Sequence, residues 1–154
     1  DLGIAGKPDT LPSTIGFTKI GEIPLVLIAP SLPCAVHTQA FADKPDWSSI
    51  PFILPEHGPS RKRTEQWFQH HHINNPLIYA TVSGHEAIVP MVALGCGIAL
   101  IPSVVVEHSS QPILNRITEI TDVSMVPPLE LGLCVQKKRL SDPLIHAFWK
   151  TLSS

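Results

Sequence analysis

The sequence contains no apolar run long enough to cross a membrane, and it contains few charged residues. A membrane helix needs about 18 or more consecutive apolar residues, and no segment reaches that length. The first residues also lack the basic and then apolar layout of an export signal. Charged residues make up 16% of the chain and hydrophobic residues 44%, which excludes a disordered polypeptide. We expect a soluble globular protein of 154 residues, with one core or two small lobes.

Positive charge is too scarce for the chain to attract a polyanion. The formal net charge is −2 and the isoelectric point is near 6.5, which argues against DNA or RNA as the partner of these residues. Two short basic runs, Arg61–Arg63 and Lys137–Arg139, are interpreted as solvated surface and not as phosphate-binding patches.

The cysteines form no paired motif. Cys34, Cys96 and Cys134 are odd in number, far apart and never spaced as C-x-x-C, which is typical of proteins in a reducing cytosol. Each lies beside apolar residues, so we interpret each as a small buried hydrophobe and not as a reactive thiol.

Motifs for catalysis, metals and dinucleotides are also absent. No serine lies in G-x-S-x-G, and no carboxylate pair has the spacing of an acid and its base. His70–His72 are consecutive, and consecutive helical positions point about 100° apart, so they cannot share one metal ion on a regular helix. Gly95–Gly97 follows a helical segment and precedes a strand, the reverse of a dinucleotide loop. We interpret it as a helix-to-strand turn, with Gly95 in the left-handed conformation that ends helices.

Short apolar runs alternate with segments of helical periodicity. The runs predict strands over 1–6, 23–30, 50–55, 75–82, 98–102 and 129–136. Helices are predicted over 60–72, 84–95 and 142–152, the last with Asp142 as its cap and Pro143 at its first position. Residues 31–46 are expected to form a loop. Strands separated by helices of about ten residues predict an α/β fold with mostly parallel sheets.

Polar residues gather at the turns where predicted strands lead into helices. In open parallel sheets the carboxyl ends of the strands form the ligand crevice, and free N–H groups at helix N-termini favour a negative oxygen. We therefore expect a small carboxylate to be bound by Gly6, Lys7, His57, Gly58, Ser60, Ser83, Gly84 and His85. An alternative for Ser60 and Ser83 is that each only caps its own helix.

The order of these segments resembles a known family. The segments are DLGIAG, IPLVLIAPSLP, IPFILPEHGPSRKRTEQWF, YATVSGHEAIVPMVALGCGIALIP and LELGLCVQKKRLSDPLIHAFWKTL, which together cover most of the chain. They resemble the effector-binding domain of LysR-type transcriptional regulators, and MVALGCGIALIP is the most diagnostic piece. The resemblance implies two Rossmann-like lobes with a cleft between them, as in type II periplasmic binding proteins.

The resemblance also implies where the lobes begin and end. The first lobe would comprise residues 1–33 with 128–154, and the second residues 34–127, with crossings near Ser31–Cys34 and Pro127–Leu129. The effector would be contacted by Gly6 and Lys7 from the first lobe, and by His57–Ser60 and Ser83–His85 from the second. The opening part of the first lobe and the winged helix-turn-helix domain would lie outside this sequence. We expect a fragment of a longer, cytoplasmic regulator that reaches promoter DNA through that missing domain.

A narrower resemblance concerns the ligand. KPDW, NPLIYATVSGHEA, ALGCGIALIP and QKKRLSDPLIHAFWK are similar to LysR-type activators of isoleucine and valine biosynthesis. This implies a homodimer or homotetramer that needs no cofactor, that is induced by 2-acetolactate or 2-acetohydroxybutyrate, and that activates expression of ketol-acid reductoisomerase.

Two other functional classes remain open from the residues alone. One is a free-standing binding protein for small carboxylates. The other is an α/β enzyme that acts on a 2-oxo or 2-hydroxy acid, with His57 or His85 as a base. Turnover of the bound acid would identify the enzyme, and a carboxylate that is bound without turnover would exclude it.

Overall fold

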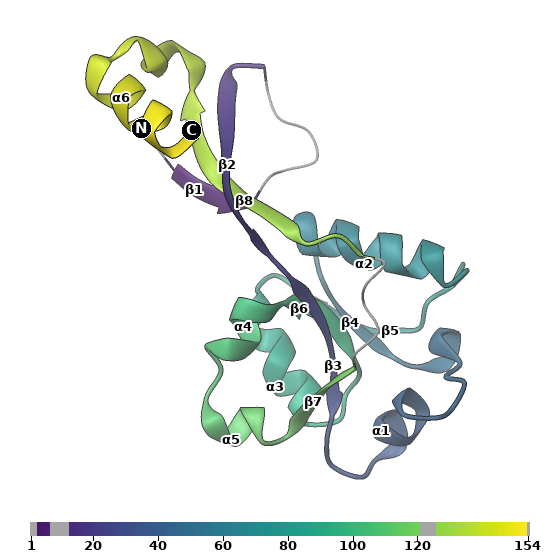
Figure 1. Ribbon diagram of the computed structural model, residues 1–154. Coiled ribbons are helices and arrows are strands. Elements are labelled where there is room, and N and C mark those ends of the chain that lie inside the picture. Colours follow the sequence, from purple (N-terminus) through teal and green to yellow (C-terminus); the bar gives the residue numbers. More distant parts are fainter. Residues whose placement is uncertain (1–2, 7–12, 121–125, 154) are drawn as a thin grey trace. The chain divides into compact units, whose positions relative to one another are not determined.

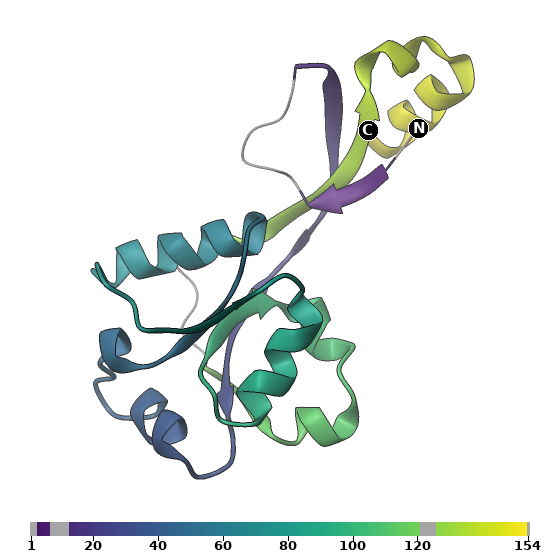
Figure 2. The ribbon, with the colours of Figure 1, turned by 180° about the vertical axis from the view of Figure 1, so that it is seen from behind.

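The computed structural model describes residues 3–6, 13–120 and 126–153 and divides into two compact units (Figures 1 and 2). Unit 1 comprises Asp1–Ile23 with Pro128–Ser154, and unit 2 comprises Pro24–Pro127. None of the helices within the described ranges combines the length and the apolar character that crossing a bilayer requires.

Unit 1 is a three-stranded antiparallel sheet with a helix against it. β8 (Leu129–Gln136) lies between β1 (Gly3–Gly6) and β2 (Ile15–Ile23). A short 3-10 helix, η3 (Lys137–Ser141), then leads into α6 (Pro143–Ser153). A Cβ built on Gly16 of β2 would lie 3.6 Å from the Trp149 ring, so α6 packs closely on this strand. The predicted strand 1–6 is confirmed over Gly3–Gly6, and its first two residues lie outside the described part of the chain. The predicted strand 129–136 and the predicted helix 142–152 are confirmed as well.

The cap predicted for the last helix is also confirmed. The Leu144 N–H donates to Asp142 Oδ1 at 2.9 Å, and Pro143 follows the cap directly. Replacing Asp142 with alanine leaves that N–H without its side-chain acceptor, and we expect the variant to lose about 1 kcal/mol of unfolding free energy. Urea denaturation of Asp142→Ala beside Asp142→Asn, which keeps an acceptor oxygen, measures the effect. Equal losses in the two variants would rule out the capping contribution.

Unit 2 is built on a mixed sheet. β3 (Leu25–Pro30) pairs with β6 (Ala99–Pro102) on one side and with β7 (Ile117–Ile120) on the other, both antiparallel. β4 (Phe52–Pro55) pairs with β5 (Ile78–Val82) in parallel. Ile98 joins the two groups, because its N–H donates to the Pro51 carbonyl and its carbonyl accepts from Ile53 N–H, both at 2.9 Å. The spatial order is therefore β5-β4-β6-β3-β7.

The expectation of mostly parallel sheets is wrong, because among the described strand pairs only β4–β5 and the Phe52–Ile98 bridge are parallel, and the sheet of unit 1 and both pairings of β3 are antiparallel. The run of buried residues in β3 is confirmed, with Leu27, Ile28 and Ala29 fully buried, but both of its neighbours are antiparallel. Burial on both faces only requires cover from both sides, and a central antiparallel strand satisfies that as well as a parallel one. The same pairing places β3 in unit 2, so the first division of the chain lies before this strand and not after it.

Helices cover both faces of the unit 2 sheet (Figure 2). They are α1 (Ala35–Ala40), η1 (Trp47–Ser49), α2 (Pro59–His70), η2 (His85–Ala87), α3 (Ile88–Ala93), α4 (Ser103–Glu107) and α5 (Gln111–Leu114). The predicted helices near 60–72 and 84–95 are confirmed, and Gly95 has the expected positive φ of 89°. The loop expected over 31–46 is wrong, because α1 and its cap lie there. One core cluster unites β3, β4, α3, β6 and α4 through Ile28, Ile53, Ile88, Val89, Val92, Ala99, Ile101 and Val106.

Candidate functional site

Three parallel strand ends lie along one edge of the unit 2 sheet. β4 and β5 run in the same direction, and the Phe52–Ile98 bridge shows that the strand leading into β6 shares it. The chain leaves these strands at Glu56, Ser83 and Ser103, each time toward a helix. The first two turns are joined by a hydrogen bond from Glu56 N–H to the Val82 carbonyl at 2.9 Å. The three turns that begin at Glu56, Ser83 and Ser103 form the strand-end edge of unit 2, and the predicted residues of the second lobe lie on the first two of them.

A side-chain hydrogen bond links the turn after β4 to the turn after β5. His85 Nε2 lies 3.0 Å from Ser60 Oγ, although the two residues are 25 positions apart in the sequence. Ser60 is 2% exposed and occupies the second position of α2, whose N-cap is Gly58 with a φ of 97°. Ser60 therefore does not cap its own helix. Its hydroxyl instead fixes the His85 imidazole against the start of α2.

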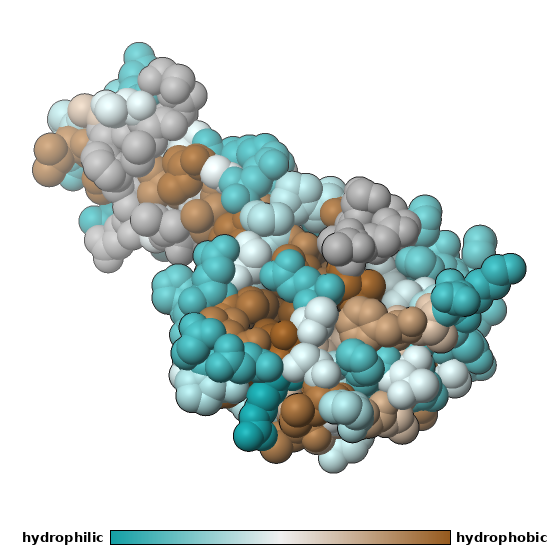
Figure 3. Space-filling view, turned by 60° about the horizontal axis from the view of Figure 1, so that its bottom comes forward, coloured by the Kyte–Doolittle hydropathy of each residue, from teal (hydrophilic) through white to brown (hydrophobic). Residues whose placement is uncertain are grey.

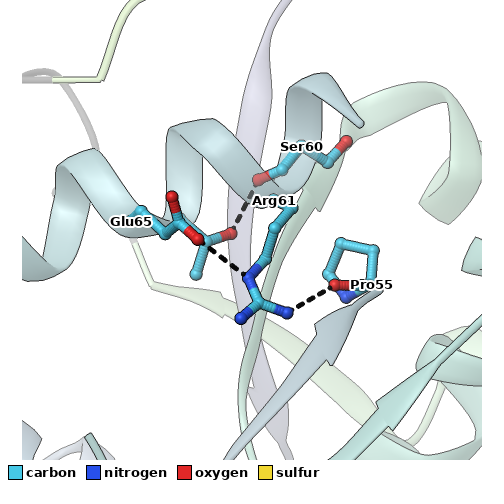
Figure 4. Close-up of polar contacts among 5 residues, drawn as sticks. Pro55, Ser60, Arg61 and Glu65 are labelled. Atoms are coloured by element: carbon cyan, nitrogen blue, oxygen red, sulfur yellow. Dashed lines mark hydrogen bonds and ion pairs between the residues drawn. The ribbon is translucent and has the colours of Figure 1, made fainter. Parts of the chain in front are cut away.

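Arg61 anchors the first turns of α2 to the end of β4 (Figure 4). Its Nη1 donates to the Pro55 carbonyl at 3.0 Å, and its Nε donates to Glu65 Oε1 at 3.2 Å. In the same turns Thr64 Oγ1 donates to the Ser60 carbonyl at 2.8 Å. The Arg61 guanidinium is thus half-buried and engaged, so the interpretation of this basic run as purely solvated surface is wrong for its first residue.

The environment of His85 favours the neutral imidazole. Burial lowers the pKa of His85 below its ordinary value of 6.5, and the Glu86 carboxylate opposes that shift only in part. The side chain is therefore neutral at pH 7 and carries one N–H donor and one acceptor nitrogen. This imidazole can contribute a directed hydrogen bond at the strand-end edge, but no positive charge.

The remaining predicted residues are distributed over both units. His57, Gly58 and Ser83 are exposed at the turns after β4 and β5, and Gly84 is half-exposed between Ser83 and His85. A Cβ on Gly84 would meet only the end of the Glu86 side chain, so the turn after β5 has space beside it. In unit 1, Gly6 ends β1, and Lys7 lies outside the described residues. The structure thus brings together the six predicted residues of unit 2, and among these Ser60 and His85 contact each other directly.

A hollow of about 430 Å³ lies beside His85 within unit 2. Apart from His85, the hollow could not be predicted from local sequence patterns, because its walls come from three separate helical segments. The one available signal was the turn after β6, a third strand end that leads into α4. The lining residues are His85, Glu86, Pro90, Val104, Val105, His108, Ser109 and Ile113.

The described histidine, cysteine and acidic side chains do not gather into a metal site. Across the described residues, no three His, Cys, Asp or Glu side chains lie close enough together to hold a metal ion. His70 and His71 are near each other, with ring centroids 5.5 Å apart, but His70 is exposed, and His71 packs against Trp67 at the end of α2.

Comparison with known proteins gives consistent results in sequence and in structure. The chain is 57% identical over 152 residues to the HTH-type transcriptional activator IlvY of Salmonella typhimurium, which covers 99% of this chain and 52% of the relative. It is 55% identical over 152 residues to the regulator IlvY of Escherichia coli K12, covering 99% and 51%. The chain therefore spans about half the length of the curated relatives it matches.

The fold matches solved effector-binding domains. The effector-binding domain of QuiR, in a complex with shikimate, superimposes with a TM-score of 0.74 at 18% identity, covering 99% of this chain and 70% of that one. At this identity the likeness concerns the fold alone, and it confirms the expected periplasmic-binding-protein-like α/β architecture. The model of the LysR substrate binding domain matches residues 1–154. By this match over its whole length, the chain belongs to the LysR substrate-binding domain family.

Proposed function

We propose that this chain is the effector-sensing part of a DNA-binding transcriptional regulator, and that the strand-end edge of unit 2 holds the carboxylate of its effector. The relatives are named as HTH-type transcriptional activators, which supports regulation and not catalysis as the role of the whole protein. Promoter DNA would be contacted by a helix-turn-helix domain beyond these residues.

The observation that carries the proposal is the Ser60–His85 hydrogen bond at the strand-end edge. It holds two separate turns in one arrangement before any ligand arrives, so little ordering is left to be done on binding. The first-turn N–H groups of Ser60 and Arg61 have no acceptor within α2, because they precede the fifth helical residue. Such N–H groups, at the positive end of a 12-residue helix, favour a negative oxygen.

Further effector contacts are assigned to each unit separately. From unit 2 we assign His57, Gly58, Ser83 and Gly84, which are accessible at the same turns. From unit 1 we assign Gly6 and Lys7, whose ammonium would neutralise the carboxylate. The effector would then bias the equilibrium between two arrangements of the regulator, by about 1–3 kcal/mol in typical cases.

The identity to IlvY regulators supports a specific ligand class. At 57% over 99% of this chain, the relation favours the inducers implied by the narrower resemblance, the acetohydroxy acids 2-acetolactate and 2-acetohydroxybutyrate. The controlled enzyme would be ketol-acid reductoisomerase. We further propose that the regulator works in the cytoplasm as a homodimer or a homotetramer.

Ser83→Ala is expected to weaken binding of 2-acetolactate about tenfold. The exposed hydroxyl would donate to the effector carboxylate, and a hydrogen bond to a charged group contributes about 1.5–3 kcal/mol. Isothermal titration calorimetry of the full-length regulator measures the loss. Ser110→Ala is the matched control, because Ser110 is an exposed serine of the same unit that precedes α5.

Two results would contradict the proposal in different ways. Equal affinity of Ser83→Ala and the parent protein would remove Ser83 from the site. Conversion of 2-acetolactate to a product, followed by proton NMR during the titration, would instead establish an enzyme.

A further inference from the structure

The hollow beside His85 has the size and the walls of a small-molecule site. Its volume of about 430 Å³ falls within the range of about 300–1,000 Å³ typical of ligand pockets. The apolar part of its lining consists of Pro90, Val104, Val105 and Ile113. Val105 and Ile113 also pack against the core cluster of unit 2, so this floor is supported from behind. Figure 3 shows apolar surface ringed by hydrophilic side chains on the face where α4 and α5 lie.

The polar rim of the hollow is rich in acceptors and poor in available donors. His108 Nδ1 lies 2.7 Å from the Val104 carbonyl and must donate to it, which leaves Nε2 as an acceptor in the neutral ring. Ser109 Oγ donates to the Val105 carbonyl at 3.0 Å, so its proton is already used. His85 Nε2 is engaged with Ser60. His108 and Ser109 therefore offer a ligand lone pairs and no free proton.

The charge on the rim comes from Glu86. This carboxylate is exposed at the mouth of the hollow and forms no ion pair with any described residue. The described lining residues contain no lysine and no arginine that could balance it. Glu86 would repel a bound carboxylate here. An ammonium group carries three N–H donors for the acceptors on the rim, and it has no acceptor that would need a donor. The rim of the hollow thus favours a cationic group over a carboxylate.

We propose that the hollow between η2–α3, α4 and α5 is a second ligand site, which binds a small aliphatic compound through an ammonium group held by Glu86 and His108. The alkyl part lies on the valine, proline and isoleucine floor. This site does not depend on the effector role of the strand-end turns, because its ligand carries the opposite charge. The hollow and the strand-end turns share His85, which lines the hollow and is hydrogen-bonded to Ser60 of α2.

Isobutylamine is the probe that tests the site. The test is a titration of isobutylamine into the full-length protein at pH 7.5, with the backbone amides followed by two-dimensional NMR. The expected result is a saturable shift of the amides of Glu86, Ser109 and Ile113, with a dissociation constant on the order of millimolar. Isobutanol and isobutyrate keep the alkyl group but lack the ammonium group. Both are expected to bind at least about tenfold more weakly, because neither can form a charged hydrogen bond with the Glu86 carboxylate.

Variants separate the local contact from a general charge effect. Glu86→Gln is expected to weaken the binding of isobutylamine about fivefold, because an ion pair with an exposed carboxylate contributes only modestly to affinity. Glu107→Gln makes the same change in charge on an exposed residue of α4 that does not line the hollow, and it is expected to leave the affinity unchanged. Val104→Phe fills the floor and is expected to abolish the shifts, while the remaining spectrum reports an intact fold.

Three outcomes would overturn the proposal. They are amide shifts confined to other parts of the protein, equal binding of isobutylamine and isobutanol, and equal effects of Glu86→Gln and Glu107→Gln. None of them bears on 2-acetolactate binding and its dependence on Ser83, so failure here is distinguishable from failure of the effector site.

Discussion

Replacing Trp67 with alanine is expected to lower the unfolding free energy of unit 2 by about 3–5 kcal/mol, the range for truncating a buried tryptophan. Trp67 is 1% exposed on the inner face of α2. Its ring centroid lies 5.1 Å from that of Trp47, 5.4 Å from that of Phe52 and 4.2 Å from that of His71. Removing the indole leaves a cavity between α2, β4 and η1 that these rigid rings cannot close.

Urea denaturation followed by circular dichroism measures this loss, and Trp67→Phe is the matched variant. The indole Nε1 is buried and has no hydrogen-bond partner among the described residues. Phenylalanine keeps most of the ring contacts and removes that unsatisfied N–H, so we expect it to cost about 1 kcal/mol, well below the alanine variant. If phenylalanine and alanine destabilised unit 2 equally, ring packing would not be what holds α2 on the sheet.

The same cluster supports the candidate site. Phe52 of β4 and Trp67 of α2 pack together at the far end of the strand-helix pair from the turn that carries Gly58 and Ser60. That turn is closed by Arg61 on the Pro55 carbonyl. The position of Ser60 therefore depends on packing at one end of α2 and on a charged hydrogen bond at the other, and His85 is held through Ser60 in turn.

Elements with strong local signals could be predicted from the sequence. α2 starts at Pro59, α6 follows the Asp142 cap, and α3 ends at the left-handed Gly95, and each signal acts within a few residues. α1 was not predictable in the same way, because its N-cap acceptor is the sulfur of Cys34, which accepts from His37 N–H at 3.5 Å. Cysteine is not among the residues that mark helix starts.

Strand direction and the partners of the site residues were beyond local reasoning. The apolar pattern of β3 records burial but not the antiparallel pairing with β6 and β7. The turns after β4 and β5 could be located, because glycine, proline and serine follow an apolar run there. That Ser60 would contact His85 could not, since this depends on parallel pairing of strands far apart in the sequence. The turn after β6 carries valines and one serine, too little polarity to mark the hollow.

Gly97→Ala is expected to cost unit 2 about 2–3 kcal/mol, because the added methyl group meets backbone. A Cβ at this position would lie 2.6 Å from the Pro51 carbonyl oxygen and 3.1 Å from its carbon. That carbonyl accepts the 2.9 Å hydrogen bond from Ile98 N–H, which joins β4 to the strand leading into β6. Relief of the clash requires the strands to separate at their only described bridge, and overpacking of this kind costs about 1–3 kcal/mol.

Gly84→Ala provides the control for Gly97→Ala within the same unit. There the new methyl group meets only the end of the flexible Glu86 side chain, which can move away, and φ is −137°. We expect a change within about 0.5 kcal/mol, as for most surface substitutions. Urea denaturation of both variants, followed by the fluorescence of Trp47 and Trp67, compares them directly. Equal stability of the two variants would mean that the close approach of Gly97 to Pro51 is not required. The strand-end edge exists only while β4 and β6 stay joined, so Gly97→Ala should also weaken the binding of 2-acetolactate.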